Sequence, residues 1–314
     1  MGQFASLRTQ KIEGFEEFGE VVVGTRREVV QLQHGKLRGR VSHASIGSLR
    51  VDLARFNLGM RTKGASGAEG VVIGMLADSA DRVTRSSYES EPGDVLVTPA
   101  GSEHENRYYG GGSVIIVTIP SDDISSSFQS EGELGDPAAW RRSHFKGNAY
   151  IVQNVVPRLH SLVARLGETP LEADAAEYWK RAVIEAMSAT IISGTSSERD
   201  GPLPSSLKVV KQVEGYLDAA GPGPIHISEI CRQMHLSRRT LHRAFHEALG
   251  KGPIAFLRHR RLCAVHSALR APKDIRTISE IAMQFGFQNL GRFAGYYHRL
   301  FGEYPSETRS RELM

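Results

Sequence analysis

Short apolar runs separated by turn-forming clusters dominate the first third of the chain. Between residues 20 and 120 the runs LRVDL, GVVIGML, DVLVTP and SVIIVTI are rich in β-branched residues, and Gly, Pro, Asp and Ser fill the gaps between them. Short strands at this spacing, with no helical period between them, are typical of a β-sandwich or a small β-barrel. We therefore expect an all-β barrel over residues 1–140, with flanking helices.

The hydrophobic period changes to that of a helix at about Asn148. Apolar residues then recur at steps of three and four, in two successive stripes. Pro157 interrupts the first stripe, which predicts a kink or a restart there. The first stripe comprises Val152, Val155, Val156, Leu159, Leu162, Val163 and Leu166, and the second Ala176, Trp179, Val183, Ala186, Met187 and Thr190. This helical segment, residues 141–193, either packs back on the barrel or supplies the contact face of a dimer.

A polar, proline-containing stretch divides the chain. SGTSSERDGPLPSS, which begins at Ser193, predicts a linker over residues 194–206, and residues 207–314 show only helical periods. The two parts also differ in charge, because residues 205–314 carry a net charge of +8 and residues 1–204 a net charge of −4. A basic module on a mildly acidic body indicates a polyanionic partner for that module alone.

An internal repeat organises the basic module. The tetrapeptide ISEI begins at Ile227 and again at Ile278, and in each copy the apolar spacing predicts a helix, a tight turn and a second helix. Gly286 can supply the positive φ of the second turn, and Ser237 and Asn289 are expected to cap the second helices. Between the copies, PIAFLRHRRLCAVHSALR predicts one long helix. The repeat therefore predicts an all-α domain with two helix-turn-helix units in tandem.

The second helix of the first copy exposes long hydrogen-bond donors. Its apolar residues define an inward face, and the opposite face then carries Arg238, Arg239, His242 and Arg243. Donors on the exposed start of a helix are what the reading of a DNA major groove requires. The alternative is a helical bundle whose basic residues are merely solvated, and the repeat together with the charge of +8 argues against it.

Both repeats resemble a known family. HLSRRTLHRAF in the first copy and FGFQNLGRFAGYYHRLFGEYPSETR in the second are similar to the signatures of the AraC/XylS family of bacterial transcription regulators, and the resemblance covers residues 205–310. Within the family, SRRTLHRAFHEALGKGPIAFL most resembles the ethanolamine operon regulator group. The resemblance implies a cytoplasmic activator with an effector-binding N-terminal domain. It also implies a homodimer that binds double-stranded promoter DNA on repeated half-sites and contacts RNA polymerase.

The resemblance further implies which residues contact DNA. The residues that it carries over are Ser237, Arg238, Arg239, His242 and Arg243 in the first unit, and Asn289, Gly291, Arg292 and Gly295 in the second. Arg238 falls on a phosphate contact. Gly291 and Gly295 have no hydrogen-bonding side chain where family members often carry long polar residues. We therefore expect the first helix to supply most of the base readout and the second to contact mainly backbone and shape.

The stretch PGDVLVTPAGSEH resembles one half of a cupin metal motif. Gly93, Pro99, Gly101 and His104 fit the pattern, but Tyr108 stands where the pattern has asparagine, and the chain contains no H-x-H. Because a catalytic metal usually takes three protein ligands, we expect no metal, no other cofactor and no enzyme activity. The family resemblance instead implies a cupin-like barrel that binds an effector without metal.

Polar residues that continue an apolar strand face are candidates for effector contacts. In LRVDLARFN the period-2 apolar face continues to Arg55 and Asn57, which points both side chains toward the barrel interior. A buried arginine needs an anionic partner, which is either a ligand or an intramolecular carboxylate. A bulge at Ala54 that turns Arg55 outward is a further alternative. The candidate ligand-binding residues are Arg55, Asn57, Arg61, His104 and Tyr108.

The effector class stays open at this stage. Arg61 and Lys63 are compatible with an anionic ligand, including a phosphate-bearing signal such as a cyclic dinucleotide. The resemblance to the ethanolamine regulator points instead to a small amine.

The rest of the composition excludes several classes of protein. No run approaches the roughly 18 apolar residues that cross a bilayer, the N-terminus has no apolar signal-peptide region, and two cysteines cannot build a disulfide framework. We therefore predict a cytoplasmic, ligand-responsive, sequence-specific DNA-binding transcription regulator without a membrane partner. The rivals are a constitutive DNA-binding protein whose barrel only dimerises, and a metal-dependent cupin enzyme fused to a DNA-binding domain.

Overall fold

The chain folds into two compact units. The computed structural model describes residues 5–21, 28–66, 70–86, 88–120, 123, 144–166, 172–193, 205–221, 223–271 and 275–311. The first unit comprises Met1–Val29 and Leu37–Arg199, and the second comprises Val30–Lys36 and Asp200–Met314. Residues 194–204 of the predicted linker lie outside the described residues, and a helix already begins at Ser205.

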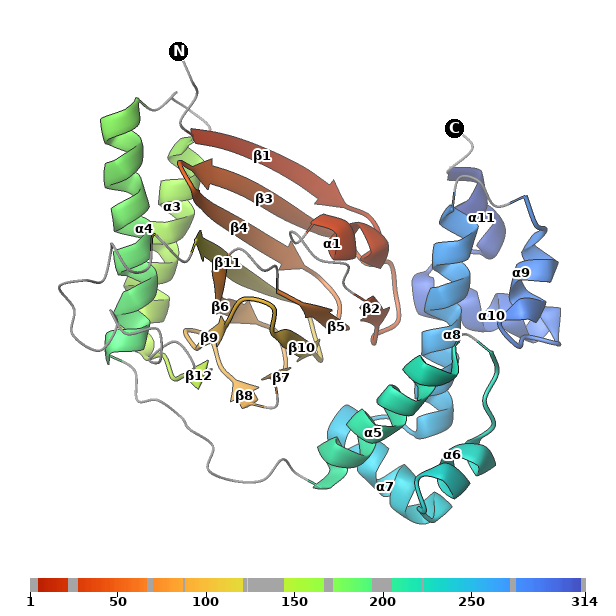
Figure 1. Ribbon diagram of the computed structural model, residues 1–314. Coiled ribbons are helices and arrows are strands. Elements are labelled where there is room, and N and C mark those ends of the chain that lie inside the picture. Colours follow the sequence, from red (N-terminus) through yellow and green to blue (C-terminus); the bar gives the residue numbers. More distant parts are fainter. Residues whose placement is uncertain are drawn as a thin grey trace. The chain divides into compact units, whose positions relative to one another are not determined.

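Two antiparallel sheets form the first unit. The larger sheet has the strand order β1-β3-β4-β11-β6-β9-β12 and the smaller sheet the order β2-β5-β10-β7-β8 (Figure 1). The elements are β1 (Ala5–Ile12), α1 (Phe15–Val21), β2 (Glu28–Gln31), β3 (Gly39–Ile46), β4 (Leu49–Phe56), β5 (Met60–Ala65), β6 (Gly70–Ser79), β7 (Val83–Arg85), β8 (Tyr88–Ser90), β9 (Val95–Thr98), β10 (Glu103–Tyr108), β11 (Gly112–Pro120) and β12 (His144–Phe145). The expected all-β domain with flanking helices is confirmed.

A pair of helices covers one face of the larger sheet. The apolar stripes of α3 (Val156–Leu166) and α4 (Ala173–Ser193) pack with alternate residues of β3, β4, β6 and β11 into one buried cluster (Figure 1). On β4 this face carries Leu49 and Val51, and Val117 lies directly across from Val51 on β11. Because the other face of the same strands looks toward the smaller sheet, both faces of the larger sheet are buried over much of its area.

The predicted interruption at Pro157 is confirmed. A π-helical turn, η3 (Ile151–Val155), precedes α3, and the N–H of Val156 donates to the carbonyl of Ile151. Proline has no N–H to donate and its ring crowds the carbonyl four residues earlier, so a widened turn just before Pro157 accommodates the ring.

The apolar stripes of α3 and α4 are used within the unit. The exposed positions of α4 are mainly charged, and they include Glu177, Arg181 and Glu185. The packing of these helices on the barrel therefore follows one of the two expected arrangements, and a dimer contact through this segment stays a prediction.

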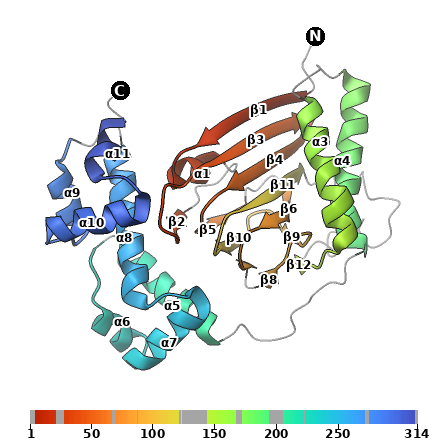
Figure 2. The ribbon, with the colours of Figure 1, turned by 180° about the vertical axis from the view of Figure 1, so that it is seen from behind.

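From Ser205 onward the second unit is helical. Its helices are α5 (Ser205–Ala220), α6 (Ile227–Gln233), α7 (Arg238–Leu249), α8 (Pro253–Arg270), α9 (Ile278–Gln284), α10 (Leu290–Phe301) and α11 (Pro305–Arg311). The pairs α6–α7 and α9–α10 are the two predicted helix-turn-helix units, and the long helix α8 lies between them (Figure 2). The short segment Val30–Lys36 completes this unit, since Gln31 and Gly35 both donate hydrogen bonds to the carbonyl of Leu300.

The local chemistry of the repeat explains its geometry. Gly286 has a φ of 83°, as the second turn requires, and His235 occupies the equivalent position of the first turn with a φ of 52°. Ser237 and Asn289 cap α7 and α10 by accepting hydrogen bonds from backbone N–H groups of the first turn. The predicted caps and the all-α tandem helix-turn-helix fold are confirmed.

No described helix has the length and apolar character needed to cross a bilayer. Neither of the described cysteines, Cys231 and Cys263, is part of a disulfide, and Cys263 is buried.

Candidate nucleic-acid interface and effector pocket

Helix α7 separates an apolar face from a basic face. Leu241 and Phe245 are buried in the core of the unit, whereas Arg239, His242 and Arg243 are exposed. The Ser237 hydroxyl accepts a hydrogen bond from the N–H of Thr240 at 3.0 Å, which stabilises the exposed start of the helix. Three donor-bearing side chains thus share one solvent face within two turns, as the sequence predicted.

Arg238 has a different setting from the other basic residues of α7. Its guanidinium donates to the hydroxyl of Ser228 on α6 at 2.7 Å, so the side chain is held between the two helices of the unit. Arg243 has a looser contact, with 3.8 Å between its Nε and the carboxylate of Glu247 one turn later. An exposed pair at that distance contributes little, so the Arg243 guanidinium remains available for a base.

The sequence reasoning missed His246. It is exposed, one turn beyond His242, and the two imidazole rings lie 6.4 Å apart between centroids. The spacing of four residues was the signal that could have extended the basic face to this position.

Helix α10 presents a flatter surface. Asn289 accepts a hydrogen bond from the N–H of Arg292 at 3.0 Å, and Arg292 itself is exposed. Gly291 and Gly295 are also exposed, and a Cβ placed on Gly295 would meet nothing within 4 Å. The two glycines leave the backbone of this helix open to close approach, which suits a contact with the phosphate backbone better than base readout.

Two further side chains extend the face of α10. Arg299 is exposed two helical turns beyond Arg292, and Tyr296 lies between them with the Arg258 guanidinium 4.0 Å from its ring centroid. The repeat of seven residues from Arg292 to Arg299 was visible in the sequence and was not used.

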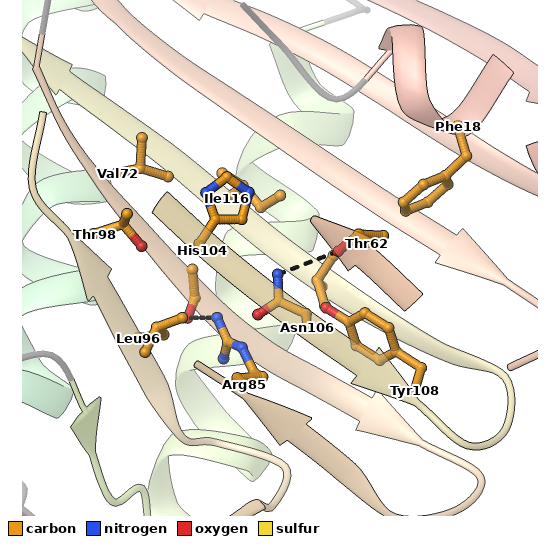
Figure 3. Close-up of a pocket in the computed structure, with 12 residues that line it drawn as sticks. Phe18, Thr62, Val72, Arg85, Leu96, Thr98, His104, Asn106, Tyr108 and Ile116 are labelled. Atoms are coloured by element: carbon orange, nitrogen blue, oxygen red, sulfur yellow. Dashed lines mark hydrogen bonds between the residues drawn. The ribbon is translucent and has the colours of Figure 1, made fainter. Parts of the chain in front are cut away.

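A pocket lies between the two sheets of the first unit. Its polar lining consists of Thr62, Arg85, Thr98, His104, Asn106 and Tyr108, and Figure 3 shows how these side chains are placed (Figure 3). The empty space among the lining residues is about 510 Å³, part of which is open solvent. Of the five predicted ligand residues, His104 and Tyr108 do line this pocket.

The expected inward orientation of Arg55 and Asn57 is wrong. Both side chains are exposed, and strand β4 pairs without a bulge at Ala54. The apolar face that Arg55 continues is the face covered by α3 and α4. On that side, burial lowers the pKa of His160, and the positive charge of Arg55 lowers it further. Alternation identifies which residues share a face, but it does not say which of two buried faces lines the pocket.

Arg61 is buried but lies on the face of the smaller sheet opposite to the pocket. Its Nε donates to the carboxylate of Glu105 at 3.1 Å, and Arg107 pairs with the same carboxylate. Burial alone would raise the pKa of Glu105, but the charges of Arg107 and Arg61 outweigh it and lower that pKa from 4.5 to about 2. The intramolecular carboxylate that the sequence left open for a buried arginine is therefore present at Arg61.

Sequence reasoning missed four polar residues of the pocket, Thr62, Thr98, Arg85 and Asn106, of which the last two bear most on its chemistry. Arg85 ends the three-residue strand β7 and is 4% exposed, and Asn106 is 9% exposed. Burial lowers the pKa of the Arg85 guanidinium, and the nearby Asp94 carboxylate only partly opposes that effect. A strand of three residues is too short for alternation to reveal its inward face, so the charge in the pocket could not be located from the pattern.

Within the described residues, no group of three or more His, Cys, Asp or Glu side chains could hold a metal ion.

Comparison with known proteins shows which domain family the C-terminal unit resembles. Residues 230–311 match the family of helix-turn-helix domains. The XylDLEGF operon transcriptional activator 2 of Pseudomonas putida is 37% identical over 91 residues, which are 29% of this chain and 58% of that protein, less than two thirds of its length. The XylDLEGF operon transcriptional activator 1 of the same species is 25% identical over 290 residues, 87% of this chain and 85% of that protein.

A solved structure gives a similar sequence match. A probable AraC family transcriptional regulator from Rhodopseudomonas palustris is 37% identical and covers 33% of this chain and 97% of its own, with a TM-score of 0.32. The particular resemblance to the ethanolamine regulator group stays a prediction. The helix-turn-helix match, the two capped repeats and the similarity to the Pseudomonas putida activators together show that the chain belongs to the AraC/XylS family of transcription regulators.

Proposed function

We propose that this protein is a ligand-responsive transcription regulator that binds promoter DNA through its two helix-turn-helix units. The observation that carries the proposal is the capped basic face of α7, where Arg239, His242 and Arg243 are exposed together opposite a buried apolar face. The named activity of the Pseudomonas putida relatives, transcriptional activation of an operon, supports the same function. The pocket between the sheets of the first unit would receive the controlling small molecule.

Base readout and positioning are divided between the two units in this proposal. Arg239, His242 and Arg243 read base edges in the major groove, while Arg238 contacts phosphate. Arg292 and the open backbone at Gly295 bring α10 against the adjacent groove, mainly through backbone and shape contacts.

The test is selection of binding sites by the full-length protein from random double-stranded DNA, followed by fluorescence anisotropy on the enriched site. We expect one enriched sequence family, with affinity for the enriched site at least about 1,000-fold above that for a scrambled duplex. Arg239→Ala combined with Arg243→Ala should abolish this preference. Arg181→Ala, an exposed arginine on α4, is the matched control and should leave it intact. Equal affinity of the wild-type protein for enriched and scrambled DNA would overturn the proposal.

The resemblance to the family supports a finer division of labour. In this proposal residues 1–140 sense the effector, residues 141–193 mediate dimerisation, residues 194–206 form the linker, and residues 207–314 bind DNA. The homodimer acts in the cytoplasm, occupies repeated half-sites and activates by contacting RNA polymerase. Sedimentation equilibrium would measure the mass of the protein in solution and on DNA, and a monomer on a single half-site would contradict the dimer. Transcription with purified RNA polymerase would show whether the protein activates or represses.

A further inference from the structure

The pocket between the sheets contains one buried cation in a setting built to hold it. The Arg85 guanidinium donates through Nη2 to the carbonyl of Gly74 at 2.6 Å and through Nη1 to the carbonyl of Asp94 at 3.4 Å. A Cβ on residue 74 would come within 2.6 Å of Nη2, so a glycine at this position leaves the space that the guanidinium occupies. Gly74 on β6 of the larger sheet and Arg85 on β7 of the smaller sheet thus fix where the positive charge lies.

Neutral carbonyl oxygens are the only hydrogen-bond acceptors of Arg85 among the described residues. Within the part of the chain that the structure describes, its Nε has no hydrogen-bond partner, although the atom is fully buried. The Asp94 carboxylate is engaged elsewhere, because it accepts hydrogen bonds from the N–H groups of Gly147 and Glu91 and pairs with His144. A buried cation without a carboxylate against it is costly, and an anionic ligand would offset that cost.

A second unsatisfied polar group lies beside Arg85. Asn106 makes one long hydrogen bond, 3.4 Å from its Nδ2 to the hydroxyl of Thr62, and its Oδ1 has no partner among the described residues. Figure 3 shows Asn106 next to Arg85, with His104 two residues earlier on strand β10 (Figure 3). The pocket therefore offers one charged contact and one adjacent hydrogen-bonding contact.

The remaining wall is apolar. Phe18, Val72, Leu96, Val114 and Ile116 complete the lining, and they come from α1, β6, β9 and β11. A ligand that satisfies Arg85 must also cover this hydrocarbon surface, so it combines one acidic group with an apolar body.

The lining discriminates among charged ligands. Arg85 is the single lysine or arginine of the twelve lining residues, and none of the twelve is an aspartate or a glutamate. An ammonium ligand would meet a like charge without a carboxylate, and a cyclic dinucleotide carries two phosphates for one cation. The planar Nε and Nη2 edge of an arginine matches the two oxygens of a carboxylate.

We propose that this pocket binds a small carboxylic acid with an apolar body, whose carboxylate pairs with Arg85 and whose second polar group, where present, contacts Asn106. The proposal rests on the proposed function, because it names the class of molecule that would control the regulator. It departs from both effector classes that the sequence suggested, the cyclic dinucleotide and the small amine.

The first experiment uses the wild-type full-length protein and matched ligands. Hexanoate, cyclohexanecarboxylate and phenylacetate are each compared with their primary amides in thermal unfolding, together with inorganic phosphate and ethanolamine. We expect at least one acid to raise Tm by about 5 °C at 100-fold excess over its Kd. The amide of that acid, which has the same shape and no charge, should raise Tm by less than about 1 °C at the same concentration.

The second experiment uses arginine variants and isothermal titration with the acid that gives the largest shift. Arg85→Gln should weaken binding of that acid by at least about 100-fold, and Arg85→Lys, which keeps the charge and loses the fork, by about 10-fold. Arg55→Gln is the matched control, since Arg55 is an exposed arginine of the same unit outside the pocket lining. It should bind the acid as the wild-type protein does. If Arg85→Gln does not fold, the contrast between acid and amide in the wild-type protein still tests whether binding requires the carboxylate charge.

Three outcomes would overturn the carboxylate assignment. These are equal stabilisation by an acid and its amide, full affinity in a folded Arg85→Gln variant, and a shift with phosphate or ethanolamine but with none of the acids. Failure of the proposed function would give a different result. A protein that binds the acid through Arg85 but selects no DNA sequence would confirm the carboxylate site and contradict the role in transcription.

Discussion

Arg243 lies on the exposed face of α7, and its carboxylate neighbour Glu247 is 3.8 Å away across an exposed helix surface. Breaking this weak ion pair costs little free energy, so nearly all of the free energy of an Arg243–base contact should contribute to DNA binding. We expect Arg243→Ala to weaken binding to the selected site by about 1–3 kcal/mol and to relax sequence preference at one base pair. Anisotropy titrations with single-base variants of the site would measure both effects. A uniform loss across all sequences would instead assign Arg243 to phosphate.

Arg238 gives the contrasting case at the same scale. Its hydrogen bond to Ser228 fixes it between α6 and α7, a position from which it can position the unit on the phosphate backbone. Arg238→Ala should weaken all duplexes alike and reduce the slope of log affinity against log salt by about 1. An unchanged slope with altered base preference would contradict this assignment.

Individual residues also show what the pattern of the chain could establish. The basic face of α7 followed from apolar spacing alone, because a helix on a single core has one buried side. The buried cation of the barrel did not follow, because both faces of the larger sheet are covered and alternation cannot choose between them. The alternation therefore predicts an interior position for Arg55, which is exposed, whereas Arg85, at the end of a three-residue strand, supplies the charge in the pocket.

At the scale of secondary structure, the two recognition helices differ in the chemistry of their backbones. Gly286 before α10 has a φ of 83°, and a Cβ there would come within 2.6 Å of Pro224. Gly295 lies inside α10 with nothing within 4 Å of such a Cβ. The first glycine is required by the turn, whereas the second is not required by the fold.

This difference predicts opposite effects of one substitution at two sites. Gly286→Ala should destabilise the protein by more than about 1 kcal/mol, because alanine must adopt positive φ and displace a neighbour. Gly295→Ala should stabilise it by about 0.5–1 kcal/mol, because alanine favours a helix interior. If α10 packs closely on DNA, the same Gly295→Ala variant should still bind DNA more weakly. Urea unfolding and anisotropy on each variant measure the two quantities, and unchanged DNA affinity would remove Gly295 from the interface.

The pairing of β5 with β10 concentrates charge on the side of the smaller sheet away from the pocket. Arg61 and Arg107 both contact Glu105, whose pKa falls from 4.5 to about 2. A carboxylate with a depressed pKa in the folded state stabilises the protein above the pKa of the unfolded state. That stabilisation, at most about 3 kcal/mol, should be lost as the pH falls from about 4.5 toward 2.

Glu105→Gln tests this pairing. At pH 7 the variant should unfold at lower urea concentration than the wild-type protein, because the buried guanidiniums of Arg61 and Arg107 lose their ion pairs with Glu105. The difference between the two proteins should shrink as the pH falls below 4.5. Glu185→Gln, on the exposed face of α4, serves as the control and should follow the wild-type protein throughout. A difference that stays constant with pH would mean that Glu105 does not titrate in this range.

At the scale of the whole molecule, the two units differ in net charge and are therefore suited to different partners. The net charge of +8 over residues 205–314 and of −4 over residues 1–204 favours a polyanion for the second unit only. The order of barrel, helical pair and tandem helix-turn-helix could be predicted because the hydrophobic period changes at about Asn148, and the polar linker and the ISEI repeat set the last part apart. The effector class could not, because it depends on which side chains from β5, β7 and β10 converge, and their pairing is not a property of any single segment.

A regulator of this design requires free-energy coupling between its two sites. If a carboxylic acid in the barrel changes DNA affinity by some factor, DNA must change the affinity for the acid by the same factor. We expect a factor between about 5 and 150, which corresponds to about 1–3 kcal/mol. Anisotropy with and without saturating acid gives one value, and calorimetric titration of the acid with and without the selected duplex gives the other. Arg85→Gln should abolish both changes while the DNA affinity of the acid-free protein stays the same. A factor of one in a protein that binds both partners would make the barrel a binding site without control over transcription.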